Sequence, residues 1–227
     1  MNATQAVGRL IAVTGIDGAG KSTLAAALQQ ACTVAGLPVI LVGKRTVNVQ
    51  GSPELSRYLD AVNAVVYRRD ASVGQASGDH YWLLALAAWY TLQDQLVVRP
   101  ALQAGTHVIL DNTHHKILAR YAVNPDVPTG LAQQVFAHLT PADLILFLHV
   151  AAEEALRRKE HFTPLEAGRT GPTSDDFVAY QQRVTDALLA YADDAWAPID
   201  VTTMKPDDVL QEVTGLLHER RILTVTA

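Results

Sequence analysis

A glycine-rich stretch near the N-terminus has the residue types and spacing of a phosphate-binding loop. It reads GIDGAGKST and fits G-x-x-x-x-G-K-[ST] at every fixed position. Its glycines allow a tight turn that points backbone N–H groups at an anion, and the helix that follows adds the positive end of its dipole. In such a loop Lys21 reaches the β- and γ-phosphates, and the Ser22 hydroxyl binds Mg²⁺. The expected nucleotide-binding residues are Gly15, Asp17, Gly18, Ala19, Gly20, Lys21, Ser22 and Thr23.

A carboxylate at the end of a buried strand provides a second magnesium ligand. The stretch VILDNTHHK runs from Val108 to Lys116, and Asp111 ends its apolar part. Parallel α/β sheets bind ligands at the carboxyl ends of their strands, so Asp111 is expected to face the metal directly or through water. The alternative role for Asp111 is to cap the helical segment that follows.

The order of segments predicts a parallel α/β sheet. Short runs rich in Val, Ile and Leu do not alternate polar with apolar residues, as expected for strands covered on both faces. Helical patterns separate these runs, which favours a three-layer α/β/α arrangement around five parallel strands. The expected strands are 9–15, 38–43, 107–111, 144–150 and 199–203, and the expected helices are 22–35, 54–69, 79–104, 130–139, 151–160, 174–195 and 207–221.

Composition and charge narrow the classes of partner. The formal net charge is −5, and the basic residues form no run longer than Arg157-Arg158-Lys159, so we expect no nucleic-acid partner. The longest apolar run, Tyr81 to Tyr90, is too short to span a bilayer, so no membrane partner is expected. A single cysteine, Cys32, and an N-terminus without a signal-peptide pattern predict a cytoplasmic location.

The rest of the chain favours a small kinase over other nucleotide-binding proteins. GTPases carry an Asn-Lys-x-Asp signature that is missing here, and motor and transporter ATPases are larger. A long loop with two prolines, two glycines and Arg169 lies between two helices, where a lid could close over the phosphates. We therefore expect one kinase domain over residues 1–227, with a lid at about 157–174.

The chain resembles the thymidylate kinase family over almost its whole length. RLIAVTGIDGAGKST is similar to the family's first strand and phosphate loop, and VVRPALQAGTHVILD to the segment that delivers the magnesium carboxylate. LILFLHVAAEEALRRK resembles the fourth strand and the start of the lid helix, and DDFVAYQQRVTDALLAYA and IDVTTMKPDDVLQEV resemble the closing elements. The resemblance implies a P-loop NTPase fold, ATP and Mg²⁺ as cofactors, and a homodimer formed through the apolar helix at 79–98. It also implies that residues 200–206 pack beside adenine.

Three acceptor-side arginine positions of the family are changed in this chain. The family's Arg-Glu-Pro-Gly stretch is replaced by GKRTVNVQG, which retains only Lys44 and Arg45 as cations. Its Asp-Arg pair in the third helix is replaced by LAAWYTLQ, which includes Trp89, and the arginine after the magnesium carboxylate is replaced by Asn112. A nucleoside monophosphate brings about two negative charges, and neither Asn nor Trp can replace a bidentate guanidinium group.

These changes predict an acceptor that lacks a phosphate and offers a hydroxyl group as the nucleophile. Asp17 could then orient that hydroxyl group or accept its proton, and Asp79 could add a polar contact. The close alternative is a thymidylate or other nucleoside monophosphate kinase whose arginines come from shifted positions, such as Arg45 and Arg120. The expected acceptor-binding residues are Lys44, Arg45, His80, Trp89, Asn112, His114 and His115.

Several of these residues have an equally ordinary structural role. His114 and His115 open a helical segment, where surface histidines are common. Trp82 and Trp89 share one helix face, which is more typical of core or dimer packing than of base stacking. In the lid, at least one arginine is expected to contact the transferring phosphoryl group, although the same arginines could pair with nearby glutamates. The lid arginines are Arg157, Arg158 and Arg169, and the glutamates are Glu153, Glu154 and Glu160.

The sequence thus predicts an ATP- and Mg²⁺-dependent small-molecule kinase that uses a nucleoside, an aminosugar or another specialised metabolite as acceptor. Its expected catalytic residues are Lys21, Asp17, Asp111, Arg158 and Arg169. Two alternatives remain open: the monophosphate kinase described above, and a nucleotide-binding protein that has lost catalysis. Intact Lys21, Ser22 and Asp111 argue against the second alternative.

Overall fold

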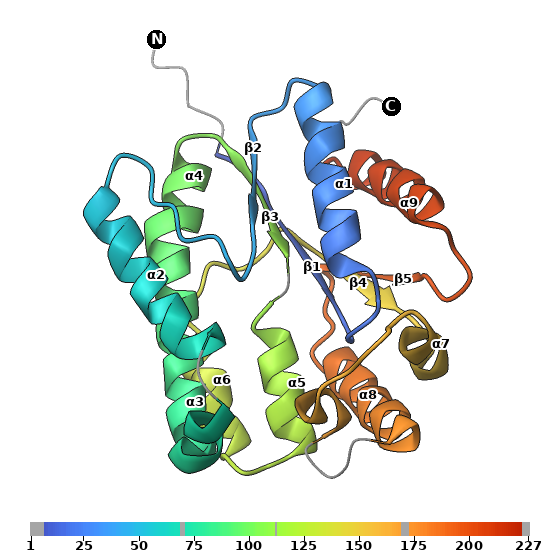
Figure 1. Ribbon diagram of the computed structural model, residues 1–227. Coiled ribbons are helices and arrows are strands. Elements are labelled where there is room, and N and C mark those ends of the chain that lie inside the picture. The colour runs from blue at the N-terminus through green and yellow to red at the C-terminus, as the bar shows by residue number, and fades with distance from the viewer. Residues whose placement is uncertain (1–6, 69–70, 112, 169–172, 224–227) are drawn as a thin grey trace.

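The computed structural model describes residues 7–68, 71–111, 113–168 and 173–223, and these contain a five-stranded parallel sheet with helices on both sides (Figure 1). The strand order is β2-β3-β1-β4-β5, and every neighbouring pair is parallel. This is the fold class that the sequence predicts. The strands are β1 (Leu10–Gly15), β2 (Val39–Val42), β3 (His107–Asp111), β4 (Leu144–His149) and β5 (Trp196–Asp200).

The centre of the sheet is buried because helices cover both of its faces. All six residues of β1 are buried, as are the first five of β4. The register places Val13 of β1 opposite Asp111 of β3 and opposite Leu146 of β4. The phosphate loop, which follows β1, therefore lies between the carboxyl ends of its two neighbours, where parallel sheets bind ligands.

The last strand begins three residues earlier than the sequence predicts. β5 pairs with β4 from Trp196 opposite Ile145 to Asp200 opposite His149. Pro198 lies within this strand, and its pyrrolidine ring removes one backbone donor. An edge strand tolerates that loss, since only one of its sides pairs with a neighbour.

Two helices cover one face of the sheet. α1 starts at the phosphate loop and packs against β1, β2 and β3, and α9 lies beside it (Figure 1). The buried face of α1 includes Leu24, Leu28 and Cys32, so the cysteine is a core residue. These helices are α1 (Lys21–Val34) and α9 (Pro206–Glu219).

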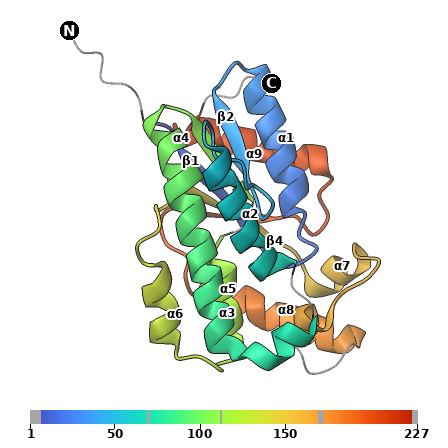
Figure 2. The ribbon, with the colours of Figure 1, turned by 60° about the vertical axis from the view of Figure 1, so that its left-hand side comes forward.

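A longer set of helices covers the opposite face. α3 bends at Gly78, where the backbone leaves helical angles, and continues through the π-helical stretch Asp94–Val98 into α4. The sequence predicts one uninterrupted helix over 79–104. The structure has a wider π turn in this range, and it accommodates Pro100, which cannot donate a normal helical hydrogen bond. Figure 2 shows α2 beside α3, with α5, α6 and α8 lower in the molecule. The bounds are α2 (Pro53–Tyr67), α3 (Ala71–Gln93), α4 (Arg99–Gln103), α5 (His115–Val123), α6 (Thr129–Phe136) and α8 (Ser174–Leu189).

The segment expected to form the lid is short and only partly helical. α7 (Ala152–Arg157) ends earlier than the predicted helix over 151–160, and a 3-10 helix covers Pro164–Ala167. A capping box fixes the start of this turn, because the Thr163 backbone N–H donates to Glu166. The turn packs against α8, which places it beside the phosphate loop.

No helix in the described part of the chain has both the length and the apolar character needed to cross a membrane.

Candidate active site

The phosphate loop needs glycine at two positions for steric reasons. Gly15 and Gly18 have φ angles of 144° and 90°. A Cβ atom at Gly15 would lie 2.6 Å from the Leu148 carbonyl oxygen, and one at Gly18 would lie 2.6 Å from the Ala155 carbonyl oxygen. Because the loop passes this close to the backbone of β4 and α7, only glycine fits there.

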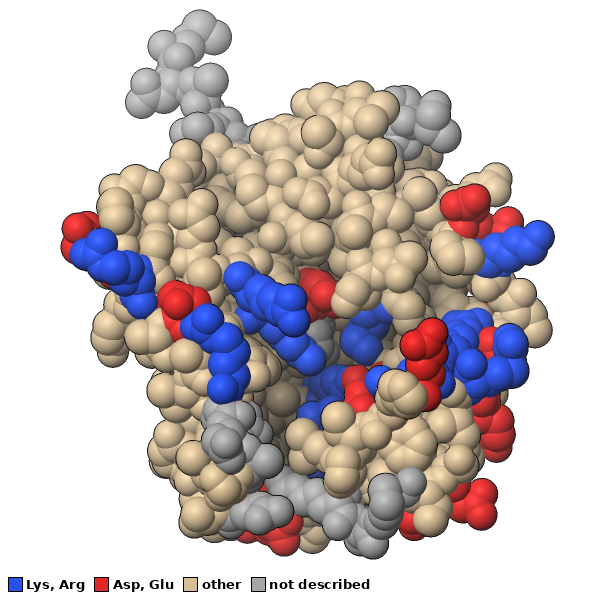
Figure 3. All heavy atoms as spheres, viewed as in Figure 1, with Lys and Arg blue, Asp and Glu red and all other residues tan. Residues whose placement is uncertain are grey.

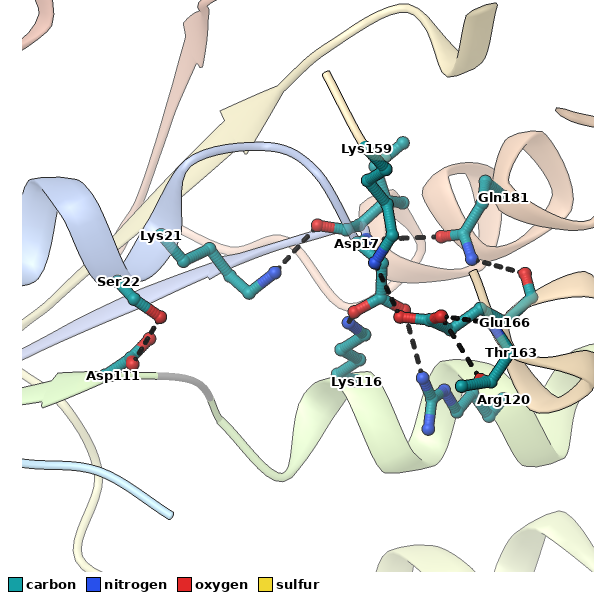
Figure 4. A network of polar contacts seen from close by, with 11 residues as sticks. Asp17, Lys21, Ser22, Asp111, Lys116, Arg120, Lys159, Thr163, Glu166 and Gln181 are labelled. Atoms are coloured by element: carbon teal, nitrogen blue, oxygen red, sulfur yellow. Dashed lines mark hydrogen bonds and ion pairs between the residues drawn. The ribbon is translucent and has the colours of Figure 1, made fainter. Parts of the chain in front are cut away.

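Lys21 lies close to the Ser22–Asp111 pair, which is expected to bind the metal (Figure 4). The Lys21 ammonium donates to the Ile16 carbonyl at 2.7 Å, so its side chain folds back over the loop. The Ser22 hydroxyl donates to Asp111 Oδ2, also at 2.7 Å. A hydroxyl and a carboxylate held this close at the end of two neighbouring strands suit the oxygen preference of Mg²⁺. This placement fits the metal pair that the sequence predicts.

All of the predicted nucleotide-binding residues except Gly15 and Ala19 line one open cleft of about 690 Å³. Figure 3 shows Lys and Arg side chains gathered around a hollow in this face of the molecule. Asp17 and Asp111 contribute carboxylates to the cleft, and Lys44 and Arg45 from the loop after β2 lie at it, as the sequence predicts. The lining residues are Asp17, Gly18, Gly20, Lys21, Ser22, Thr23, Gln29, Leu41, Gly43, Lys44, Arg45, Thr46, Asp111 and Lys116.

A second cavity of about 860 Å³ adjoins the cleft on its other side. It shares Gly18, Gly20 and Thr23 with the cleft and extends to residues 201–207. These overlap the stretch 200–206 that the resemblance implies packs beside adenine. Arg158 lies here: its Nη2 atom donates to the Val201 carbonyl at 2.7 Å, and its Nε atom donates to Glu154 at 2.7 Å. Arg158, one of the three lid arginines expected to contact the transferring phosphoryl group, is therefore held beside residues 201–207. Arg157 pairs with Glu154 and is exposed.

Asp17 is bound by two cations from α5, and this corrects its expected role as a base. Lys116 Nζ forms an ion pair with Asp17 Oδ1, and Arg120 Nη2 lies 3.1 Å from Oδ2. Burial alone would raise the pKa of Asp17, but the charges of Lys116, Arg120 and Lys21 outweigh burial and hold the pKa well below its usual value. A carboxylate with so low a pKa is a weak proton acceptor, so Asp17 acts as a counter-ion.

A buried amide joins the phosphate loop to the segment expected to form the lid (Figure 4). Gln181 of α8 is 1% exposed; its Oε1 atom accepts from the Asp17 backbone N–H at 3.3 Å, and its Nε2 atom donates to the Glu166 carbonyl at 2.7 Å. The Glu166 carboxylate is paired with Lys159 at 2.8 Å. The sequence pattern predicts no role for Lys116, Gln181 or Glu166, and only the four-residue spacing of Lys116 and Arg120 marks a shared helix face.

The structure places four of the predicted acceptor-binding residues away from the cleft. His114 stacks on Phe136 with ring centroids 5.3 Å apart, and His115 packs edge-on against Trp196 at 5.2 Å. Both histidines line a separate cavity that contains no residue of the phosphate loop. Trp89 is 1% exposed in the core, and His80 is an exposed residue of α3 that does not line the cleft. The residues Asn112 and Arg169 lie outside the described part of the chain.

Comparison with known proteins identifies relatives of one kind. No protein-family model matches the chain. A thymidylate kinase of Xanthomonas oryzae pv. oryzae (strain PXO99A) is 30% identical over 151 residues, which cover 66% of this chain and 60% of that protein. The chain thus spans less than two thirds of the length of that relative. A thymidylate kinase of Bdellovibrio bacteriovorus is 24% identical over 225 residues, covering 95% of this chain and 98% of that protein.

Further matches extend the similarity in sequence and in fold. A probable thymidylate kinase of Thermococcus gammatolerans is 28% identical over 218 residues, covering 94% of this chain and 97% of that protein. A solved structure of thymidylate kinase from Candida albicans covers 95% of this chain and 93% of that chain, with a TM-score of 0.69 and 18% sequence identity, which shows a shared fold. In sequence this chain is thus similar to thymidylate kinases over nearly its whole length, and it shares the fold of a solved thymidylate kinase.

Proposed function

We propose that this chain transfers the γ-phosphoryl group of ATP to the phosphate of a nucleoside monophosphate, with thymidylate (dTMP) as the first acceptor to test. The observation that carries the proposal is the cleft in which Lys21, the Ser22–Asp111 pair and Lys116 of α5 meet. Relatives named thymidylate kinase, two of them similar over nearly the whole chain, support the same activity.

This proposal replaces the hydroxyl acceptor that the sequence predicts. That prediction depended on missing arginines and on histidines as acceptor contacts. His114 and His115 line another cavity, whereas Arg120, one of the shifted arginines named in the alternative, reaches the phosphate loop. The described structure therefore leaves the hydroxyl acceptor with few of its predicted contacts, and the monophosphate kinase fits better.

The chain's own groups supply positioning and charge to the transfer. Lys21 binds the β- and γ-phosphates together with the backbone N–H groups of the loop, and the cavity beside residues 201–207 holds the nucleoside of ATP. Ser22 and Asp111 hold Mg²⁺, which when bound neutralises charge on the phosphate oxygens. The bond between the γ-phosphorus and the oxygen of the leaving ADP breaks, and a bond to an acceptor phosphate oxygen forms in line with it. The products are ADP and a nucleoside diphosphate.

The proposal is tested by measuring ADP release from ATP and Mg²⁺ with two parallel sets of acceptors. One set contains dTMP and the other nucleoside monophosphates; the second contains thymidine, other nucleosides, aminosugars and aminocyclitols. We expect turnover in the first set. Lys21→Ala removes a positive charge from the phosphates and should lower kcat/KM by roughly 100-fold or more.

Two results would count against the proposal. Turnover restricted to the second set would restore the hydroxyl acceptor. Full biological activity of the Lys21→Ala variant would instead show a nucleotide-binding protein that does not depend on catalysis. Circular dichroism of the variant establishes that any loss of turnover is not a loss of folding.

We also propose that the chain forms a homodimer through α2 and α3. The family resemblance implies a homodimer through the apolar helix at 79–98. We add α2, which packs against α3, because both helices carry large apolar side chains that are exposed in the monomer. These are Leu55, Tyr58 and Val65 on α2 and Val73, Tyr81 and Leu84 on α3.

A further inference from the structure

Three basic side chains and one carboxylate meet beneath the phosphate loop. Lys116 and Arg120 are four residues apart on α5, and both pair with Asp17. The Lys116 side chain is 3% exposed and that of Asp17 is 14% exposed. We propose that Lys116 and Arg120 bind the phosphate of the acceptor, with Asp17 holding them in place. This inference rests on the proposed monophosphate kinase activity and names the residues that give it specificity.

The charges in this cluster do not balance. Lys21, Lys116 and Arg120 surround the single carboxylate of Asp17. Asp111 is engaged with Ser22, and Glu166 with Lys159. Asp79 and Asp126 line the cavity beside Arg120, but neither is among the charges that shift the pKa of Asp17 or of Lys116. Burying charge without a counter-charge is costly, so a buried surplus of cations favours an anion as ligand. Lys116 and Arg120 share the one carboxylate of Asp17, and a phosphate monoester, which supplies about two negative charges, would neutralise what remains.

The ionisation of Lys116 agrees with the same surplus. Burial lowers the pKa of this lysine, and the charge of Lys21 lowers it further, although Asp17 opposes both effects. An arriving dianion would favour the charged form of Lys116 and relieve the repulsion between the cations.

Arg120 has a free donor for such a ligand. Its Nη2 atom is used by Asp17, but its Nε atom is buried and has no hydrogen-bond partner among the described residues. Leaving a buried N–H group unpaired costs free energy, so such atoms are uncommon in folded proteins. A guanidinium group presents its donors as a fork that matches phosphate oxygens.

The two basic residues, four positions apart on α5, line two different cavities. Lys116 lines the phosphate cleft, on the side of Lys21. Arg120 lines a smaller cavity whose wall includes Trp82, Tyr121 and Tyr180. A nucleoside monophosphate has the corresponding two parts, a phosphate for the cations and a planar base for the aromatic wall. The cation pair on α5 would then supply the charge that the replaced family arginines no longer give.

The alternative is that Lys116 and Arg120 only attach α5 to the phosphate loop through Asp17. Both roles predict that their loss destabilises the protein. Only the proposed role predicts that their loss changes the ratio between the affinities for a nucleoside monophosphate and for its nucleoside. This ratio is therefore the quantity to measure.

The test is isothermal titration calorimetry of dTMP and of thymidine against the full chain, without ATP. We expect Lys116→Gln and Arg120→Gln each to weaken dTMP binding by about 10- to 100-fold, the usual effect of removing one charge-assisted hydrogen bond. Thymidine binding should change by less than about twofold, because thymidine has no phosphate. Arg120→Lys keeps a cation without the fork, so its dTMP affinity should lie between those of the wild type and Arg120→Gln.

Arg99→Gln provides the matched control. Arg99 pairs with Asp94 at 2.7 Å, and the Asp94 side chain is 8% exposed, so this variant also breaks a partly buried arginine–aspartate pair. Neither residue lines the phosphate cleft. The variant should lose stability while keeping the ratio between the dTMP and thymidine affinities.

Two outcomes overturn the inference. The first is that the affinities for dTMP and thymidine fall together, which assigns Lys116 and Arg120 a structural role only. The second is that dTMP binding does not depend on these two residues, either because the unaltered protein does not bind dTMP or because both variants bind it as well as the unaltered protein does. Turnover by the unaltered protein separates the two proposals. If the unaltered protein phosphorylates dTMP but the variants keep the ratio between the dTMP and thymidine affinities, the kinase function stands and the proposed site is refuted. If dTMP binds through Lys116 but is not phosphorylated, the site stands and the kinase function is refuted.

Discussion

At the scale of single residues, His114 and His115 show how position decides the role of a titratable group. Their rings lie 4.2 Å apart and pack against Phe136 and Trp196. Burial lowers the pKa of His114 to about 3 and that of His115 to about 4. Both imidazoles are therefore neutral at physiological pH and contribute to packing as planar rings.

This pair should make the fold sensitive to acid. An unfolded histidine takes up a proton near pH 6.5. In the folded protein His114 stays neutral down to about pH 3 and His115 down to about pH 4. Between these values the unfolded state binds more protons, so the free energy of unfolding falls as the pH falls below about 6.5. The slope is at most about 1.4 kcal/mol per pH unit for each histidine. Urea unfolding at pH 7 and pH 5 measures the loss.

Substitutions separate the histidines from the acidic residues, which also titrate in acid. His114→Gln or His115→Gln removes one titrating group, so the stability lost between pH 7 and pH 5 should shrink. His80→Gln changes an exposed histidine and should leave that loss unaltered. An equal loss in all three variants and in the wild type would contradict the prediction.

At the scale of elements, α8 connects the phosphate loop with the segment expected to form the lid. Gln181→Leu keeps a buried side chain of similar size but removes the bonds to the Asp17 N–H and the Glu166 carbonyl. Both backbone groups would lose a partner, which should cost about 1–3 kcal/mol of stability. Amide hydrogen exchange should also become faster at residues 163–168. The urea midpoint alone does not reveal this local effect.

The neighbouring residue provides the control for this prediction. Gln182 is exposed and bonds to Asp186 on its own helix at 3.1 Å. Gln182→Leu should leave exchange at residues 163–168 unchanged. Unaltered exchange in Gln181→Leu as well would mean that this amide does not hold the turn in place.

Local patterns explain what the sequence could predict at this scale. The phosphate loop, the parallel strands and Asp111 are each specified within a few neighbouring residues, and the structure shows them together. The partners of Asp17 could not be predicted in the same way, because Lys116 lies 99 positions away and its contact depends on how α5 packs. The prediction that His114 and His115 contact the acceptor fails for a related reason. Their place at the start of a helix is compatible with an exposed site, and only the packing of Phe136 and Trp196 against their rings shows that they are buried.

At the scale of the whole molecule, the exposed apolar side chains of α2 and α3 predict self-association. Leu84 is 55% exposed and Tyr58 is 59% exposed. A patch of this kind on a folded chain marks an interaction surface. Light scattering should give twice the 24.5 kDa chain mass at micromolar concentration. Leu84→Glu places a charge in the patch and should yield the monomer.

A second exposed leucine tests whether the position matters. Leu189 at the end of α8 is 45% exposed and lies outside α2 and α3. Leu189→Glu should therefore leave the dimer intact. A monomer for the unaltered protein would refute the proposed dimer.

The pairing of β1 with β3 has a consequence for how the protein is made. Ser22 and Asp111 are 89 positions apart, and they meet because Val13 is opposite Asp111 in the sheet. A slip of one residue would move Asp111 by about 3.3 Å and turn its side chain to the other face. Parallel pairing of segments so distant forms slowly during folding. During synthesis on the ribosome, the phosphate loop is therefore complete long before Asp111, the second expected magnesium ligand, has been added to the chain.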